Sequence, residues 1–140
     1  MNIDELLPAA SQLAQRDIRA DQATWPAYNR LWLEILHAVS RNGMIALLFA
    51  PLDREDLARV GRLPWVDRIA WLLLDCDAQT RQARLRDRPG WSEDQIADAL
   101  HDAQHLREQL SARIDTGIHR PHAVVDGILA WVERSSASSD

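Results

Sequence analysis

The sequence of 140 residues contains no lysine, and all 16 of its basic residues are arginine. Without a lysine amine, the chain can form neither a Schiff base nor the lysine contact of a phosphate-binding loop. The single cysteine, Cys76, excludes an internal disulfide and a zinc site built from several cysteines. No two of the five glycines have the spacing of a glycine-rich phosphate loop; they are Gly43, Gly61, Gly90, Gly117 and Gly127.

Long hydrophobic runs and excess positive charge are also missing. The longest apolar run, Met44 to Leu52, is far too short to cross a bilayer. The opening MNIDELLPAA has neither the basic region nor the long apolar region of a signal peptide, so we expect a cytoplasmic protein. The net charge of −5 argues against nucleic-acid binding, which needs a basic face. We therefore expect neither nucleic acid nor membrane as a partner.

The composition is that of a globular domain. Hydrophobic residues make up 46% of the chain and charged residues 26%, enough to bury a core without disulfides or metals. The length fits one domain, which we place over residues 1–134. The serine-rich end of the chain, residues 135–140, is predicted to be a disordered polar tail.

Hydrophobic periodicity predicts helices alternating with buried strands. Asn42 and Gly43 end a helix that Thr24 can cap, and Ser92 and Gln95 form a capping box before a long helix. Alternation of this kind predicts an α/β fold with three α-β-α layers around a small, mostly parallel sheet. The expected elements in chain order are helix 24–42, strand 44–50, helix 54–60, strand 69–74, helix 77–88, a long helix after Ser92, a short strand 114–116 and a last helix from 121.

One stretch of the chain resembles a known family. The apolar run Leu72–Leu74 ends in Asp75, and a helix follows with the pattern Arg81-x-x-Arg84-Leu85-x-x-Arg88. A turn, a long helix with Arg107, the strand Ile114-Asp115-Thr116 and a last helix come next. This order resembles the fourth strand, the lid and the C-terminal part of P-loop small-molecule kinases, such as the shikimate, gluconate, nucleoside and nucleotide kinases and related AAA-type ATP-binding proteins.

The resemblance implies a P-loop NTPase fold and ATP-dependent phosphoryl transfer to a small-molecule substrate. ATP and Mg²⁺ would be the cofactors. Asp4 would be the catalytic acid facing the acceptor, and Arg84, Arg88 and Arg107 would face the nucleotide; no residue is assigned as a metal ligand. The first strand of that fold, its GxxxxGK[ST] loop and its first helix have no counterpart in the 140 residues.

Two functions follow from that departure. The missing loop supplies the amides, the lysine and the magnesium-binding hydroxyl that stabilise phosphoryl transfer. We therefore expect an ATP-binding, kinase-like chain that is inactive by itself. The alternative is a non-catalytic binding or assembly module that keeps the fold.

The candidate residues also have structural interpretations. Arg81, Arg84 and Arg88 lie on one helical face, which suits either a phosphate-binding lid or a solvated face paired with nearby acids. Arg107 could be an exposed helical arginine, and Asp4 a turn residue. Asp53 is predicted to be a helix N-cap rather than a magnesium ligand. His101 and His105 are four residues apart on one helix, but no third zinc ligand accompanies them, so we expect no zinc site.

The missing strand has a consequence for the sheet. In the kinases it lies between the strands that correspond to Met44–Ala50 and Ile69–Leu74. We predict that these two strands pair directly and close the gap. The unpaired sheet edges also predict a homo-oligomer, because open apolar edges invite pairing with another chain.

Overall fold

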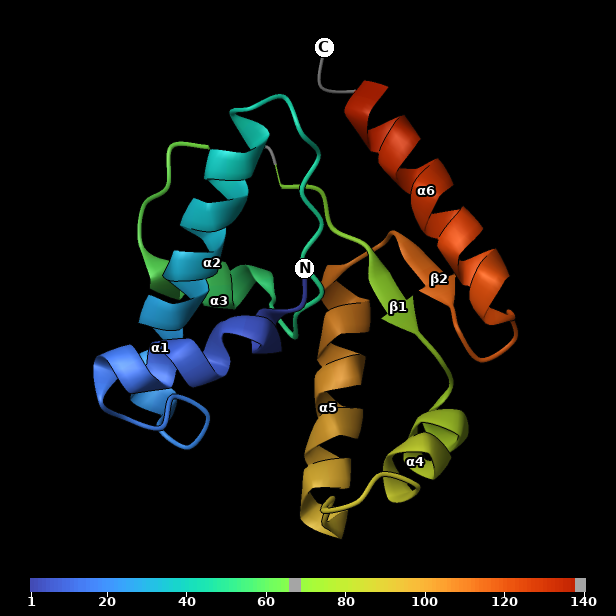
Figure 1. The fold of residues 1–140 in the computed structure, drawn as a ribbon. Coiled ribbons are helices and arrows are strands. Elements are labelled where there is room, and N and C mark those ends of the chain that lie inside the picture. Colours follow the sequence, from blue (N-terminus) through green and yellow to red (C-terminus); the bar gives the residue numbers. More distant parts are fainter. Residues whose placement is uncertain (66–68, 138–140) are drawn as a thin grey trace. The chain divides into compact units, whose positions relative to one another are not determined.

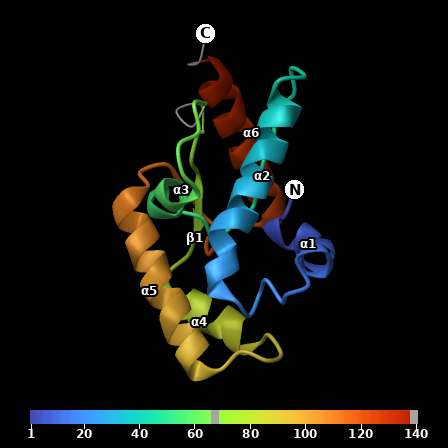
Figure 2. The same ribbon diagram turned by 90° about the vertical axis from the view of Figure 1, so that its left-hand side faces the viewer.

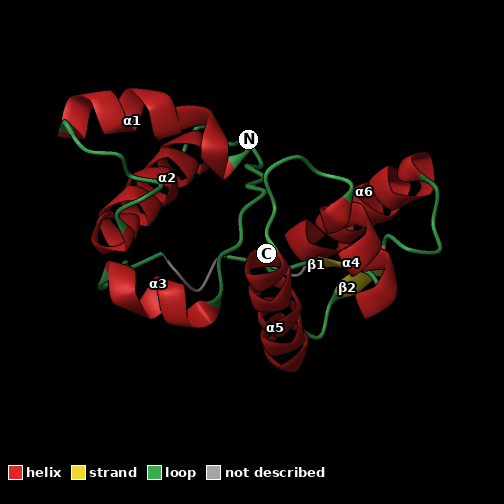
Figure 3. Ribbon diagram, turned by 90° about the horizontal axis from the view of Figure 1, so that it is seen from below, coloured by secondary structure: helices red, strands yellow, loops and turns green. Residues whose placement is uncertain are grey.

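A computed structural model describes residues 1–65 and 69–137, and the chain forms two compact units, Met1–Asp67 and Arg68–Asp140 (Figure 1). Most of the described chain is helical, and strands are confined to the second unit (Figure 3). The second unit holds a two-stranded parallel sheet, so a mixed α/β class is confirmed. Among the described residues, no helix is both long enough and apolar enough to cross a membrane.

The first unit is a set of helices packed around the N-terminal turn. Its longest helix, α2, supplies two side chains that donate to the same carbonyl oxygen, that of Ile3. These donors are the hydroxyl of Tyr28 and the indole Nε1 of Trp32, the latter at 3.0 Å. Trp32 is only 2% exposed, so this polar contact fixes the turn inside the apolar core. The elements are η1 (Ile3–Leu6), α1 (Leu7–Ala14), η2 (Gln22–Thr24), α2 (Trp25–Ser40) and α3 (Arg54–Val60).

Local capping explains where two of these helices begin. Asp53 accepts from the amide of Asp56 at 2.7 Å, and the carboxylate of Asp56 accepts from the amide of Asp53 at 3.3 Å. The predicted N-cap role of Asp53 is confirmed. Thr24 does precede α2, but its hydroxyl donates to the carbonyl of Asp21 at 2.6 Å and caps no helix amide. The predicted side-chain cap at Thr24 is therefore wrong, because Thr24 is the last residue of η2 and has helical backbone angles rather than the extended conformation of a capping residue.

The segment 44–50 is not the strand that its apolar sequence predicts. Among the described residues, its backbone pairs only near its end, where Phe49 forms a bridge with Asn2 and the carbonyl oxygen of Leu47 accepts from the amino group of Met1 at 3.0 Å. In the described chain, the amides of residues 44–48 make no backbone hydrogen bond, and Met44 and Ile45 are 55% and 63% exposed. The sheet of the second unit consists of β1 and β2 (below), and the direct pairing of segment 44–50 with Ile69–Leu74 stays a prediction. Apolar composition favours a strand, but a strand forms only where a partner completes the ladder.

The second unit follows the predicted order of elements. Its strands β1 and β2 pair in parallel, with Leu73 opposite Arg113, Leu74 opposite Ile114 and Asp75 opposite Asp115. The predicted strand 69–74 is confirmed only at its end, because β2 is three residues long and can pair with no more than that. The elements are β1 (Leu73–Asp75), α4 (Ala78–Arg86), α5 (Glu93–Gln109), β2 (Arg113–Asp115) and α6 (Pro121–Ala137).

Helices cover both faces of this sheet. Alternation places Asp75, Arg113 and Asp115 on one face and Ile114 on the other. The first face receives Arg107 from α5, and the second receives α6 at Gly127, where an added Cβ would lie 3.0 Å from Ile114 Cδ1. Figures 1 and 2 show α5 and α6 on opposite sides of β1.

Caps again set the helix ends in this unit. The predicted capping box is confirmed: the amide of Gln95 donates to Ser92 Oγ at 3.2 Å, and the amide of Ser92 donates to Gln95 Oε1 at 2.9 Å. The last helix continues to Ala137, three residues into the predicted tail, and Ser136 Oγ donates back to the carbonyl of Val132 at 2.9 Å. The remaining tail, residues 138–140, lies outside the described residues.

Replacing Ser92 by alanine should lower the free energy of unfolding by about 1 kcal/mol, because an amide of the first turn of α5 loses its acceptor. Urea unfolding followed by circular dichroism measures the change. Ser111→Ala is the matched control, because Ser111 is exposed and its hydroxyl makes no hydrogen bond among the described residues. An equal loss of stability in both variants would contradict the capping role.

Candidate functional site

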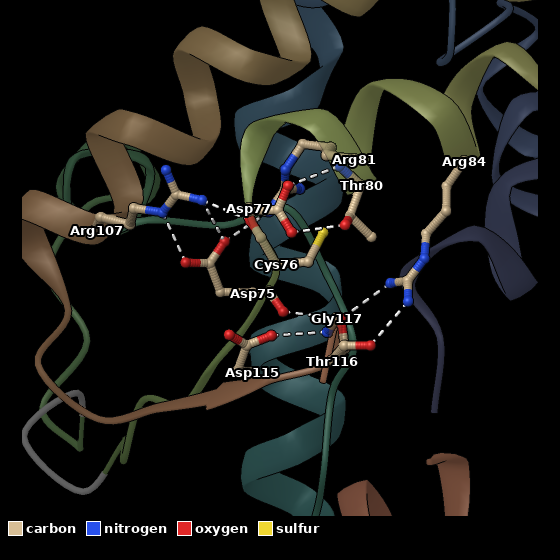
Figure 4. A network of polar contacts seen from close by, with 10 residues as sticks. All are labelled: Asp75, Cys76, Asp77, Thr80, Arg81, Arg84, Arg107, Asp115, Thr116 and Gly117. Carbon is tan, nitrogen blue, oxygen red and sulfur yellow. Dashed lines mark hydrogen bonds and ion pairs between the residues drawn. The ribbon is translucent and has the colours of Figure 1, made fainter. Parts of the chain in front are cut away.

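The carboxylate of Asp75, at the end of β1, joins two helices. Arg107 of α5 binds it in a forked pair, with Nε 2.6 Å from Oδ2 and one terminal nitrogen 3.0 Å from Oδ1 (Figure 4). Arg81 of α4 donates to Oδ1 at 2.8 Å. The side chain of Asp75 is 10% exposed, and those of the two arginines are about a quarter exposed. A charge this shielded needs such partners, because an unpaired carboxylate would lose its hydration without compensation.

Opposing effects act on the pKa of Asp75. Burial raises the pKa, since it disfavours the charged form. Hydrogen bonds from Arg107, the Cys76 amide and Arg81, together with the charge of Arg107, outweigh burial and hold the pKa below its usual value of 3.8. Asp75 is therefore an anion at neutral pH.

The turn after β2 is fastened to the end of β1. The amide and the hydroxyl of Thr116 both donate to the carbonyl oxygen of Asp75, at 2.6 and 2.8 Å. Arg84 of α4 donates to Thr116 Oγ1 at 3.1 Å and to its carbonyl oxygen at 2.8 Å (Figure 4). The amide of Gly117 donates to Asp115 Oδ1 at 2.7 Å. The ends of both strands are thus held as one polar platform.

A pocket of about 650 Å³, here called the carboxyl-edge pocket, opens beside this platform. In open α/β sheets, ligands bind at the carboxyl ends of parallel strands. Charged side chains lie in its lining, three carboxylates and two guanidiniums, of which Asp75 and Arg107 neutralise each other. Its lining residues are Asp75, Cys76, Asp77, Ala78, Arg107, Arg113 and Asp115.

Two of these carboxylates converge. A Cβ placed on Gly117 would lie 3.0 Å from Asp115 Oδ1 and 3.5 Å from Asp77 Oδ2, so both oxygens approach the same point over a residue without a side chain. Asp77 also caps α4, accepting from the amide and the hydroxyl of Thr80 at 2.8 and 2.6 Å. Those hydrogen bonds lower the pKa of Asp77.

The structure brings some of the predicted site residues together. Arg84 and Arg107 both reach the carboxyl edge of the sheet, where they contact protein groups. Arg88 follows α4, is exposed, and makes no side-chain hydrogen bond or ion pair among the described residues. Asp4 lies in η1 of the first unit, where its half-exposed carboxylate is 3.4 Å from Arg19. Its assignment as a catalytic acid stays a prediction.

Sequence reasoning missed the residues that build the pocket. Asp75 was identified only as the acid that ends a strand, and Arg113, Asp115 and Thr116 were given no role. The sequence does contain a feature that could have identified this site: both short strands end in aspartate. Parallel pairing places such residues side by side, so two strand-ending acids predict a shared polar edge.

A metal centre has no support among the described residues. They contain no group of three or more histidine, cysteine, aspartate or glutamate side chains that could hold a metal ion. The four-residue spacing of His101 and His105 is not joined by further ligands in that part of the chain. Asp53 acts as a helix cap.

Comparison of the chain with protein-family models, with curated proteins and with solved structures finds no match.

Replacing Asp75 by asparagine should lower the free energy of unfolding by about 3 kcal/mol, because Arg81 and Arg107 keep their charges and lose their shared anion. Chemical denaturation followed by circular dichroism measures the loss. Asp102→Asn, at an exposed position of α5, is the control and should stay within about 0.5 kcal/mol of the wild type. If the two variants unfold alike, the ion pair does not stabilise the unit.

The same pair predicts a pH dependence. A carboxylate whose pKa is lowered by folding stabilises the protein above its unfolded pKa, and this stabilisation is lost as the pH falls through the folded value. The stability difference between wild type and Asp75→Asn should therefore be constant at neutral pH and shrink as the pH falls below 3.8. Unfolding of both proteins at a series of pH values measures it. A difference that grows on acidification would contradict the assignment.

Proposed function

We propose that the chain is a nucleotide-binding module of the P-loop small-molecule-kinase type, which binds its ligand weakly at the carboxyl-edge pocket and does not transfer phosphoryl groups by itself. The carrying observation is the pocket at the carboxyl ends of two parallel strands joined through α4 and α5. The helices on both faces of the sheet support the finer assignment, a three-layer P-loop NTPase arrangement without its first strand, loop and helix.

The arginines at the carboxyl edge of the sheet bind protein groups, which favours a binding role without catalysis. Arg81 and Arg107 share the carboxylate of Asp75, and Arg84 is hydrogen bonded to Thr116. A phosphate that approached the pocket would meet the positive charge of Arg113 but also the carboxylates of Asp77 and Asp115. The charged lining residues include one more carboxylate than guanidinium, so they do not attract a polyphosphate, and affinity has to come from hydrogen bonds to the sugar and the base.

The residues present do not fit a tightly bound ATP–magnesium complex. The 140 residues contain no lysine and no glycine-rich loop whose amides could surround a triphosphate. The described residues also offer no cluster of metal ligands. The arrangement agrees better with a binding or assembly role than with phosphoryl transfer.

Titration with ATP, with and without Mg²⁺, should show binding weaker than about 10 µM, which corresponds to about −7 kcal/mol. Amide NMR signals of residues 76–78 and 113–117 should shift, and Arg113→Ala should reduce these shifts by removing the guanidinium that faces the pocket. Arg41→Ala is the control, because Arg41 follows α2 in the first unit.

Two results of this titration would overturn the proposal. Binding at 10 µM or tighter would mean that the chain builds a phosphate site that the described arginines do not explain. The absence of any shift at residues that line the pocket would mean that the carboxyl-edge pocket takes no nucleotide.

The purified chain should show no ATP-dependent phosphorylation of nucleosides, nucleotides or sugar acids. Phosphoryl transfer depends on electrostatic stabilisation by a phosphate loop, its lysine and magnesium. A coupled assay for ADP release measures turnover, and an active small-molecule kinase serves as the positive control. Turnover of ~1–100 per second, the range typical of kinases, would contradict the prediction.

A further inference from the structure

Within the described part of the second unit, the outer edge of β1 has no strand partner. In the parallel ladder, Leu73 and Asp75 direct their backbone groups toward β2, so Leu72 and Leu74 direct theirs away from it. In the described chain, the amides of Leu72 and Leu74 have no backbone hydrogen-bond partner. Residues 69–74 carry no charge, and β1 has no proline or bulge that would discourage pairing. This edge can accept another strand.

The outer edge of β2 is different. Arg113 and Asp115 lie on this strand and both are exposed. Charged side chains on an edge strand oppose the addition of an apolar strand. An incoming apolar strand therefore has one suitable edge in this sheet, that of β1.

A matching donor lies in the first unit. Residues 44–50, Met-Ile-Ala-Leu-Leu-Phe-Ala, form an uncharged apolar segment between Gly43 and Pro51. Met44, Ile45 and Phe49 are 55%, 63% and 48% exposed, and the amides of residues 44–48 make no backbone hydrogen bond among the described residues. Residues 1–3 hydrogen bond to Leu47 and Phe49 along one side of the segment. The segment has the composition of a strand buried on both faces, and its amides at residues 44–48 are left for a second partner.

We propose that the segment 44–50 of one copy of this chain adds as a strand to the β1 edge of a second copy. Every chain carries one donor and one acceptor, so two copies can exchange segments reciprocally. Such an exchange closes under twofold symmetry and leaves neither a donor nor a β1 edge unpaired. A foreign strand would satisfy only the acceptor and leave the apolar segment 44–50 exposed, and this favours a second copy as the partner.

Sedimentation velocity of the full chain over a range of concentrations tests the proposal. The wild type should be a dimer that dissociates on dilution. Ala46→Pro removes an amide from the donor, and Leu72→Pro removes one from the outer edge of β1 while sparing the bonds to β2. Each variant should be monomeric at concentrations at which the wild type is dimeric.

Two further variants keep the test decisive. Ile45→Lys places a charge in the donor without a proline and should also give a monomer, with a helical circular dichroism spectrum like that of the wild type. Leu13→Lys is the matched control, because Leu13 is 88% exposed on α1, outside both proposed surfaces, and this variant should remain dimeric.

Three results would overturn the proposal. One is a wild type that stays monomeric at every concentration, which would also be the result if the segment paired within its own chain. Another is a dimer that persists in folded Ile45→Lys. The third is a Leu13→Lys variant that dissociates as readily as Ile45→Lys, which would indicate general apolar association.

Discussion

A shielded carboxylate requires cationic partners, and in this chain that requirement is met at Asp75. The forked pair with Arg107 and the contact with Arg81 tie α5 and α4 to the end of β1. Arg107 also donates to the carbonyl oxygen of Cys76 at 2.6 Å, so the chain beyond the strand is held as well. The backbone carbonyl of Asp75 in turn receives Thr116 from the end of β2. Asp75 thus contributes to the pairing of the strands, to the position of α4 and α5, and to the lining of the pocket.

The same interactions limit what the pocket can bind. A guanidinium attracts phosphate most strongly when no carboxylate already neutralises it. Arg107 lines the carboxyl-edge pocket, yet its positive charge is matched by Asp75. Arg107, one of three arginines that the resemblance assigned to the nucleotide, therefore holds the fold together. This interpretation agrees with the proposed module, which would bind its ligand weakly and perform no phosphoryl transfer.

Backbone hydrogen bonding imposes a second constraint. A two-stranded parallel sheet leaves two edges; β2 carries the exposed charges of Arg113 and Asp115, whereas the one charge of β1 is the largely buried Asp75. In the first unit, the apolar segment 44–50 hydrogen bonds to residues 1–3 through Leu47 and Phe49, and the amides of residues 44–48 make no backbone hydrogen bond among the described residues. A chain that holds both a partly unpaired apolar segment and a strand edge without a partner gains hydrogen bonds and apolar burial when the two meet. Two copies of the chain can gain these hydrogen bonds and this burial by exchanging segments, and the gain does not depend on the ligand of the pocket.

The sequence by itself determined the local structure. Helix starts at Asp53 and Ser92 depend on groups within three residues of each other, so their side chains identify them without further context. Helical periodicity likewise identified α2, α5 and α6. The secondary structure of residues 44–50 could not be predicted in this way, because a strand forms only with a partner strand, which the local composition does not specify. The role of Arg107 was decided by an acid 32 positions away in the chain. Only the parallel pairing of β1 and β2, with α5 packed across that sheet, brought Arg107 to Asp75 and made the pocket.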